Sequence, residues 1–260
     1  MNLDERIEYL RLKNKYKKTN KEWYRKWWGI LVVLSLYILA IFVLAFSFFL
    51  LQLKFSDGFA EKVLNSIEVN IKIDENFNME DYKSKMLLVE GLNNNHLGKD
   101  DASITLVLFS DFNCSYCKST AEVVAALNGK YGDRIKIIVR EFPIMNDDSI
   151  SLAIAALCAG DQGKYWQMYY KLFEVQGQFR VSDLAYIARL AGVSDVKEFS
   201  DCINSDKHYN DVYKNRVDGE ALGIQGTPTW FLKGEKLQEG FVPFSLFSDF
   251  FDKYLVDDNN

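Results

Sequence analysis

Two cysteines three positions apart, Cys114 and Cys117, are the residues of this chain best suited to redox chemistry. They follow the apolar run Ile104–Ser110 (ITLVLFS) and open the helical pattern of residues 115–130. At a helix N-terminus, free backbone N–H groups and the positive end of the helix dipole stabilise a thiolate. We therefore expect a lowered pKa and nucleophilic character for Cys114. Cys117, one turn further along, is close enough to form a disulfide with it.

A CxxC motif also occurs in zinc sites and in short structural disulfides, and both alternatives stay open on the motif alone. Zinc sites usually need four nitrogen or sulfur ligands. This chain has a single CxxC motif, and its two histidines, His96 and His208, are not spaced as a ligand pair. We therefore expect no metal. The sequence has no phosphate-binding loop and no nucleotide fingerprint, so no cofactor is predicted either.

Three further residues could take part in the redox chemistry or support it. Asp111 precedes Cys114 by three positions; we expect a solvent-facing carboxylate at the end of a strand, the alternative being a role in moving the proton of Cys114. Cys158 and Cys202 fall on two predicted helices. They form either a second disulfide, for which the even number of cysteines argues, or two buried free thiols.

The elements that position these residues follow an α/β pattern over residues 84–260. Short apolar runs predict strands, and segments with Ser at their starts and Gly at their ends predict helices. The expected strands are 85–90, 104–110, 134–142, 229–232 and 236–238, the last two joined by a Lys-Gly turn. The expected helices are 115–130, 149–160, 164–174, 182–191, 194–204, 209–222 and 244–256. A helical block of about 145–222 therefore interrupts the strands.

The N-terminal part of the chain has a different character. Residues 29–51 are 23 residues without an ionisable side chain, long enough for a membrane-spanning helix. Residues 1–28 hold nine Lys or Arg against four Asp or Glu, so the positive-inside rule places them in the cytoplasm. We expect a basic tail (1–28), an uncleaved anchor (29–51) and a stalk (52–83). A cleavable signal peptide is the alternative, although the apolar run continues past its only weak cleavage site, residues 45–47.

The charge distribution excludes one class of partner. The whole chain has a net charge of −5, and because residues 1–28 carry +5 and residues 29–51 carry none, residues 52–260 carry −10. A nucleic-acid-binding domain would present a basic surface instead, so no nucleic-acid partner is predicted.

Two motifs together resemble a known family. Residues 111–118 (DFNCSYCK) follow a buried strand, and residues 226–234 (GTPTWFLKG) open another about 110 positions later. With the helical block between them, they resemble DsbA-type thiol–disulfide oxidoreductases over residues 84–260. The resemblance implies a thioredoxin fold with an inserted helical domain. It also implies a cis peptide before Pro228 that lies against the CxxC motif, and a backbone at Thr227 that pairs with bound peptide.

The function implied by this resemblance is the introduction of disulfides into unfolded, cysteine-containing exported proteins. The active domain would lie in the periplasm or outside the cell, attached to the inner (cytoplasmic) membrane, and a membrane partner would re-oxidise it by passing electrons to quinone. Ser115 and Tyr116 depart from the Pro and aromatic or His found in many relatives, so the motif leaves oxidant and reductant undecided. The alternatives are an isomerase or reductase that dimerises through residues 52–83, and a surface-anchored binding module without catalysis.

Overall fold

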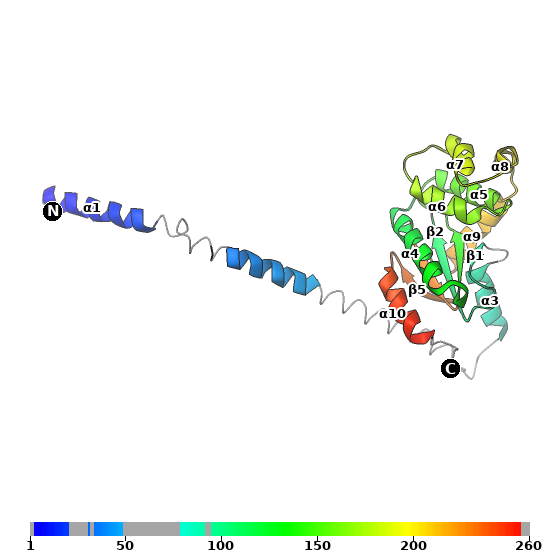
Figure 1. The fold of residues 1–260 in the computed structure, drawn as a ribbon, viewed down its shortest axis with the longest axis horizontal. Helices are drawn as coiled ribbons and strands as arrows, with labels where there is room; N and C mark the ends of the chain where they lie inside the picture. The colour runs from blue at the N-terminus through cyan, green and yellow to red at the C-terminus, as the bar shows by residue number, and fades with distance from the viewer. Residues whose placement is uncertain (1–2, 21–30, 32–33, 49–78, 92–94, 256–260) are drawn as a thin grey trace. The chain divides into compact units, whose positions relative to one another are not determined.

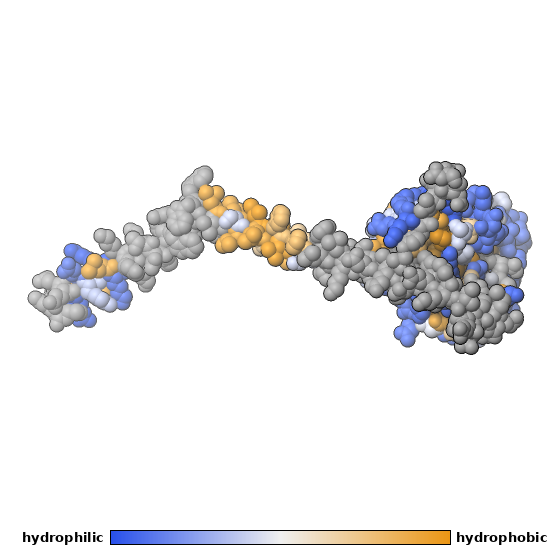
Figure 2. All heavy atoms as spheres, turned by 90° about the horizontal axis from the view of Figure 1, so that it is seen from below, coloured by the Kyte–Doolittle hydropathy of each residue, from blue (hydrophilic) through white to orange (hydrophobic). Residues whose placement is uncertain are grey.

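The computed structural model describes residues 3–20, 31, 34–48, 79–91 and 95–255, in two compact units, Met1–Gly58 and Phe59–Asn260. In the first unit, helix α1 (Leu3–Asn20) is followed by a second helical stretch at residues 34–48. Every large apolar side chain described in that stretch is exposed, from Leu34 (50%) to Phe42 (73%). Figure 2 shows the stretch almost entirely in the hydrophobic colour.

The predicted anchor is only partly covered by this description. Across the described part of the chain, no helix is both long enough and apolar enough to cross a bilayer. Of the predicted span 29–51, residues 29, 30, 32, 33 and 49–51 lie outside the described residues. The predicted stalk lies outside them as far as residue 78. The anchor is therefore not supported by the described helices and stays a prediction.

The second unit is built on a five-stranded sheet with strand order β1-β3-β2-β4-β5. Strands β2 and β3 are parallel, β4 runs antiparallel to β2, and β1 and β5 are antiparallel edge strands. The strands are β1 (His96–Leu97), β2 (Ile104–Ser110), β3 (Ile135–Glu141), β4 (Thr229–Leu232) and β5 (Glu235–Glu239). A parallel β2–β3 pair needs a crossover connection, which helix α4 (Ser115–Tyr131) and the 3-10 turn η2 (Gly132–Arg134) supply.

Alternating side chains of the central strands fill two cores, one on each face of the sheet. In β2, Leu106 and Leu108 join the larger core, which α4 and helix α10 (Phe244–Tyr254) cover. Val107 and Phe109 point to the smaller core on the other face. Helix α3 (Met79–Glu90) and the end of helix α9 (Tyr209–Ala221) close this second core, so the sheet lies between two helical layers (Figure 1).

The helical insertion follows β3 and returns to the sheet through α9 (Figure 1). Its described helices lie close to the predicted ones. They are α5 (Asp148–Gly160), α6 (Tyr165–Glu174), the 3-10 turn η3 (Val181–Asp183), α7 (Leu184–Leu190), α8 (Val196–Ile203) and α9. In α6, for example, the buried residues recur at helical spacing: Tyr165, Met168, Tyr169, Leu172 and Phe173. The fold is therefore thioredoxin-like with a helical insertion.

The predicted strand over residues 85–90 is wrong, because these residues form the second half of α3. Val89 is fully buried whereas Leu87 is 54% exposed, so the segment buries one helical stripe rather than a strand face. A short apolar run does not distinguish the two structures by periodicity. The choice is made by a distant contact: the guanidinium of Arg140 in β3 donates hydrogen bonds to the carbonyls of Leu88 and Val89 at the end of the helix.

The predicted Lys-Gly turn joins β4 to β5. Lys233 and Gly234 both have positive φ, 49° and 82°, the conformation that two-residue hairpin turns require. A side chain at position 234 would also place its Cβ only 2.6 Å from the sulfur of Met86 in α3. Glycine is therefore needed there for both conformation and space.

Candidate active site

Cys114 and Cys117 are both free thiols at the start of α4. Cys114 is the N-cap residue, with extended backbone (φ −81°, ψ 123°), so its side chain lies beside the free N–H groups of the first turn. Cys114 is 3% exposed and Cys117 is fully buried. Both thiols are therefore buried, and they differ in position: Cys114 is the N-cap residue, and Cys117 lies within the first turn of α4.

The Thr227–Pro228 segment lies directly against Cys114. Because β2 and β4 are adjacent antiparallel strands, with Phe109 opposite Thr229, the ends of both strands meet at one edge of the sheet. The peptide between Thr227 and Pro228 is cis, as the resemblance implied. In its protonated form, the Cys114 thiol donates a hydrogen bond to the carbonyl of Thr227, at 3.2 Å from sulfur to oxygen. The fold therefore brings the two separate motifs into contact.

The environment separates the two thiols electrostatically. A hydrogen bond with the Cys117 side chain and bonds with the N–H groups of Cys117 and Tyr116 lower the pKa of Cys114 to about 6, and burial partly opposes them. Burial and the neighbouring Cys114 raise the pKa of Cys117 far above that of an ordinary thiol. Near neutral pH, Cys114 is therefore a thiolate and Cys117 remains protonated, the arrangement suited to attack by one sulfur and resolution by the other.

We expect alkylation of reduced Cys114 by iodoacetamide to show a pH midpoint near 6, instead of about 8.5 for an unperturbed thiol. The same lowering has a stability consequence. Because the folded-state pKa lies below the unfolded one, thiolate stabilisation of the reduced chain is complete above about pH 8.5 and is lost as the pH falls through 6. This thiolate stabilisation contributes about 2 kcal/mol to the free energy of unfolding, once screening of the charge at the helix end is taken into account.

This contribution is measured by urea unfolding of the reduced chain at both ends of this pH range. The Cys114→Ser variant is unfolded under the same conditions for comparison. The variant should lack this part of the pH dependence. An alkylation midpoint near 8.5 for Cys114 would contradict the assignment of a stabilised thiolate.

The expectation that Asp111 faces solvent is wrong, because its side chain is almost fully buried (2% exposed). One carboxylate oxygen accepts hydrogen bonds from the Asn113 N–H and the Ser149 hydroxyl, both at 2.8 Å. The other accepts from the N–H groups of Ile144 and Met145, at 2.8 and 2.9 Å. Asp111 therefore ties the loop before Cys114 to the loop that begins the insertion, and it supports the site from behind.

Asp111→Asn is expected to lower the free energy of unfolding by about 2–3 kcal/mol, because an amide –NH2 would then face two hydrogen-bond donors of the buried loop. Urea denaturation measures this loss. The control is Asp147→Asn, an exposed carboxylate at the start of α5, which should change stability by less than about 1 kcal/mol. Equal effects of the two variants would contradict the bracing role of Asp111.

Other residues around the two thiols carry no signal in the sequence. The side-chain amide of Gln176, after α6, donates to the carbonyls of Phe112 (2.7 Å) and Cys114 (3.0 Å), so the insertion holds the CxxC loop. Three buried hydroxyls, those of Ser110, Tyr169 and Thr227, have no hydrogen-bond partner among the described residues. Ser110 stands out in the sequence only as the polar end of an apolar strand.

The two residues inside the motif face outward. Ser115 is exposed and Tyr116 is 64% exposed, so the surface beside the buried Cys114 sulfur is formed by a hydroxyl and an aromatic ring. Such a ring can pack against apolar side chains of an extended peptide while its hydroxyl stays in water.

The second cysteine pair forms a disulfide, so the alternative of two free thiols is excluded. Cys158 of α5 and Cys202 of α8 are bonded, with Cα atoms 5.9 Å apart and a sequence separation of 44 residues. A crosslink over a loop of this length restricts the unfolded chain by about 4 kcal/mol. The disulfide links two helices of the insertion, and both of its cysteines lie far from the CxxC motif along the sequence.

With this geometry established, comparison with known proteins identifies the family. The sequence profile of a thioredoxin family matches residues 92–245, more than half of the chain. The chain belongs to the thioredoxin family. The matched region includes both cysteine pairs and the cis-proline segment, and it ends at the start of α10.

Solved structures agree with this membership. A thioredoxin-like oxidoreductase from Silicibacter pomeroyi is 27% identical, with a TM-score of 0.58 over 65% of this chain and 96% of that one. The thiol-disulfide exchange protein alpha-DsbA2 from Wolbachia pipientis is 24% identical, with a TM-score of 0.59 over 67% and 96%. BdbD from Bacillus subtilis is 22% identical, with a TM-score of 0.56 over 62% and 92%. The last two, at such identity, demonstrate a shared thioredoxin fold.

Among curated proteins, this thioredoxin-family chain matches parts of Na⁺/H⁺ antiporters named NhaA 1. The protein from Mycolicibacterium gilvum is 29% identical over 143 residues, and that from Mycolicibacterium vanbaalenii is 30% identical over 141 residues. These matches cover 54% and 53% of this chain but 23% of each antiporter. The chain thus spans less than a quarter of the length of these relatives. Their names describe antiport by those proteins and do not describe this chain.

Proposed function

We propose that this chain is a thiol–disulfide oxidoreductase that introduces disulfide bonds into exported proteins through Cys114 and Cys117. The observation that carries the proposal is the position of the Cys114 sulfur, at the N-terminus of α4 and 3.2 Å from the carbonyl of Thr227. Membership of the thioredoxin family and the oxidoreductase likeness at 27% identity support the same class of reaction.

The proposed reaction starts from the Cys114–Cys117 disulfide. A substrate thiolate attacks the Cys114 sulfur, the bond between the two cysteines breaks, and the Cys117 sulfur leaves and takes up a proton. A second substrate thiolate then attacks the substrate sulfur of the mixed disulfide and releases Cys114 as a thiolate. The substrate has lost two electrons and gained a disulfide, and the enzyme holds both electrons as the reduced pair.

The direction of transfer follows from the thiolate. A pKa of about 6 stabilises the reduced form of Cys114 and makes its sulfur a good leaving group, which favours oxidation of the substrate. This value lies between about 7 for thioredoxin and about 3.5 for DsbA. It supports an oxidant of intermediate strength, so an isomerase is the competing role within the same mechanism.

Substrate is expected to bind across the CxxC motif and the cis-proline segment. The backbone of Thr227 would pair with an extended peptide beside Pro228, and the exposed Ser115 and Tyr116 would border its other side. The buried hydroxyl of Thr227 belongs to the same segment, where the peptide would bind.

The uncharged run 29–51 would hold the enzyme on the inner membrane, with its N-terminus in the cytoplasm and the thioredoxin domain outside. This part of the proposal rests on the sequence alone, on 23 consecutive residues without an ionisable side chain. A membrane partner that passes electrons to quinone would then re-oxidise the reduced pair. Leu39→Arg with Leu44→Arg should release the chain from membranes, whereas Ile7→Arg with Leu12→Arg in α1 should not.

The decisive experiment measures disulfide formation in a reduced two-cysteine peptide, with the oxidised full chain added in stoichiometric amount. We expect formation at least 100-fold faster than with the Cys114→Ser, Cys117→Ser double variant. Equal rates would contradict the proposal and favour a binding module. Equilibration with glutathione buffers then fixes the reduction potential, and a strongly reducing value would assign the chain as a reductase instead.

A further inference from the structure

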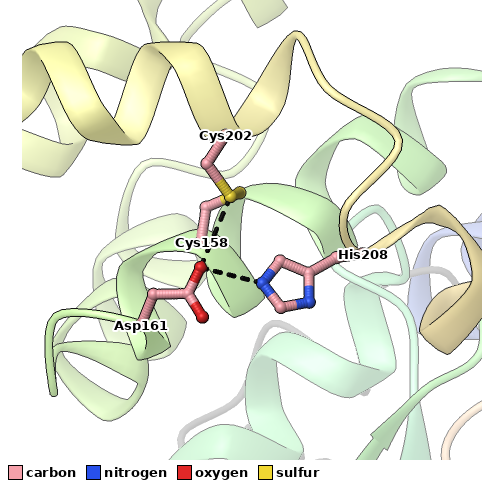
Figure 3. A group of neighbouring side chains, drawn as sticks. All are labelled: Cys158, Asp161, Cys202 and His208. Carbon is pink, nitrogen blue, oxygen red and sulfur yellow. Dashed lines mark hydrogen bonds and ion pairs between the residues drawn. A yellow bond between two sulfur atoms is a disulfide. The ribbon is translucent and has the colours of Figure 1, made fainter.

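The Cys158–Cys202 disulfide has two other potential metal ligands beside it (Figure 3). Asp161 directly follows α5, which holds Cys158, Cys202 lies in α8, and His208 precedes α9, so three segments meet here. An Asp161 carboxylate oxygen lies 3.5 Å from the Cys202 sulfur and 2.9 Å from His208 Nε2. One ligand atom of each of the four residues lies within 4.8 Å of all the others. The spacing of these four residues along the sequence does not indicate a metal site, which is why no metal was expected.

His208 is oriented as in many metal sites. Its Nδ1 lies 2.8 Å from a carboxylate oxygen of Asp211, and its Nε2 points to Asp161. A histidine ligand typically donates its second ring N–H to a carboxylate, which fixes the ring and makes the coordinating nitrogen more basic. The His208 side chain is 13% exposed, so the ring is also held by packing. Asp211 thus provides the supporting contact that a ligating His208 would need.

We propose that reduction of the Cys158–Cys202 disulfide creates a binding site for one Zn²⁺, formed by Cys158, Cys202, Asp161 and His208. Two thiolates, one imidazole and one carboxylate match the ligand types and the four-fold coordination of zinc. A disulfide sulfur is not a thiolate, so the oxidised form lacks half of the ligand set. The site is therefore controlled by the redox state of the second cysteine pair.

The geometry needs only small changes on reduction. Zn–S bonds of about 2.3 Å at a tetrahedral angle place two sulfurs about 3.8 Å apart. The Cα atoms, 5.9 Å apart, can stay in place while the side chains rotate. A surface hollow of about 230 Å³, lined by Cys158, Cys202 and Asp161, provides room and access. A larger cavity of about 520 Å³ on the other side is lined by Asp161, His208 and Asp211.

One positive group competes for the site. The Lys207 ammonium lies 2.7 Å from the same Asp161 oxygen that contacts His208. Its side chain is 55% exposed, so it can turn to solvent when a divalent ion replaces it. Three carboxylates line the hollow, those of Asp161, Glu198 and Asp201, and their charge favours a cation there.

The redox step requires a dithiol reductant. Its first thiolate attacks one sulfur of the Cys158–Cys202 bond, and its second resolves the mixed disulfide, so the reductant gains a disulfide and the protein gains two thiols. Binding of Zn²⁺ then releases the two thiol protons. The ion would link α5 and α8, the helices that the disulfide links in the oxidised form, so the insertion would stay crosslinked in both states.

The test uses the full chain with Cys114→Ser and Cys117→Ser, so that the CxxC motif contributes no ligands. After reduction with a phosphine, the chain is titrated with Co²⁺ and then Zn²⁺. We expect one ion per chain, visible Co²⁺ absorption of the intense tetrahedral type with thiolate charge-transfer bands, and displacement by Zn²⁺. The oxidised chain should bind at least 100-fold more weakly. Equal binding by the oxidised chain would overturn the proposal.

Ligand variants locate the ion. Asp161→Asn and His208→Gln keep both cysteines and should each weaken binding at least ten-fold, and Asp211→Asn should weaken it about ten-fold through His208. Asp201→Asn is the matched control, because this carboxylate lines the same hollow but is not a proposed ligand. Circular dichroism confirms folding of each variant. Unchanged affinity in both Asp161→Asn and His208→Gln would also overturn the proposal.

Discussion

Replacing Cys117 with alanine is expected to trap substrates as stable mixed disulfides on Cys114. In this variant Cys114 keeps its position at the N-terminus of α4, beside the cis-proline segment. Its thiolate still attacks a substrate disulfide, which forms the mixed disulfide and releases the other substrate sulfur as a thiolate. The buried thiol that would displace the substrate is gone, so adducts should accumulate at least ten-fold above the native level. Non-reducing electrophoresis of the full chain, expressed with secreted cysteine-containing proteins, measures them.

The matched variant is Cys114→Ala, which removes the sulfur at the N-cap of α4 and leaves that of Cys117. Cys117 is fully buried and its pKa is raised, so it should form no adducts and disulfide exchange should fall to the uncatalysed background. Adducts of equal abundance in both variants would contradict the division of roles between the two cysteines, whatever the direction of electron transfer.

Replacing Arg140 with methionine is expected to lower the free energy of unfolding by about 3–5 kcal/mol, the typical cost of breaking a buried ion pair. Arg140 is 1% exposed and donates to Asp218 at 2.6 Å, to Asn215 at 2.7 Å, and to the end of α3. Without the guanidinium, the buried carboxylates of Asp218 and the neighbouring Glu141 lose a positive charge that offsets the cost of burying them. The links from β3 to α9 and α3 would also be lost.

The same substitution at Arg216 is the control, because this arginine lies on α9, the helix to which Arg140 of β3 is bonded, but forms an exposed pair with Glu220. Arg216→Met should change stability by less than about 0.5 kcal/mol. Urea denaturation of both variants makes the comparison. Similar losses in the two would show that the buried arginine contributes no more than an exposed one and would refute the structural role given to Arg140.

Local patterns in the sequence were sufficient for most of the elements. The apolar run of β2, the stripes of the insertion helices and the Lys-Gly turn each carry their information within about ten residues, and each lies close to its predicted place. The exceptions are β1, which was not predicted, and α3. The apolar run of α3 fits a strand as well as a helix, and the end of this helix is held by hydrogen bonds from Arg140, 51 and 52 residues further along the chain.

The site divides in the same way. The chemistry of Cys114 follows from its type and from its place between a strand and a helix, both of which are readable along the chain. The partner segment at Thr227–Pro228 was found through its resemblance to a family, because no local rule connects residues so far apart. Asp111 was misjudged because three of its four hydrogen bonds come from residues 33 to 38 positions away, Ile144, Met145 and Ser149.

The sequence by itself therefore determined the candidate redox pair, the uncharged run and the order of the elements from residue 104 onward, since these depend on residue types at short range. Only the tertiary structure decided which polar groups meet. It buried Asp111 behind the site, joined Cys158 to Cys202, and placed Asp161 and His208 beside that disulfide. Such groupings depend on how helices pack on the sheet and on one another, and packing brings together residues whose spacing along the chain carries no pattern.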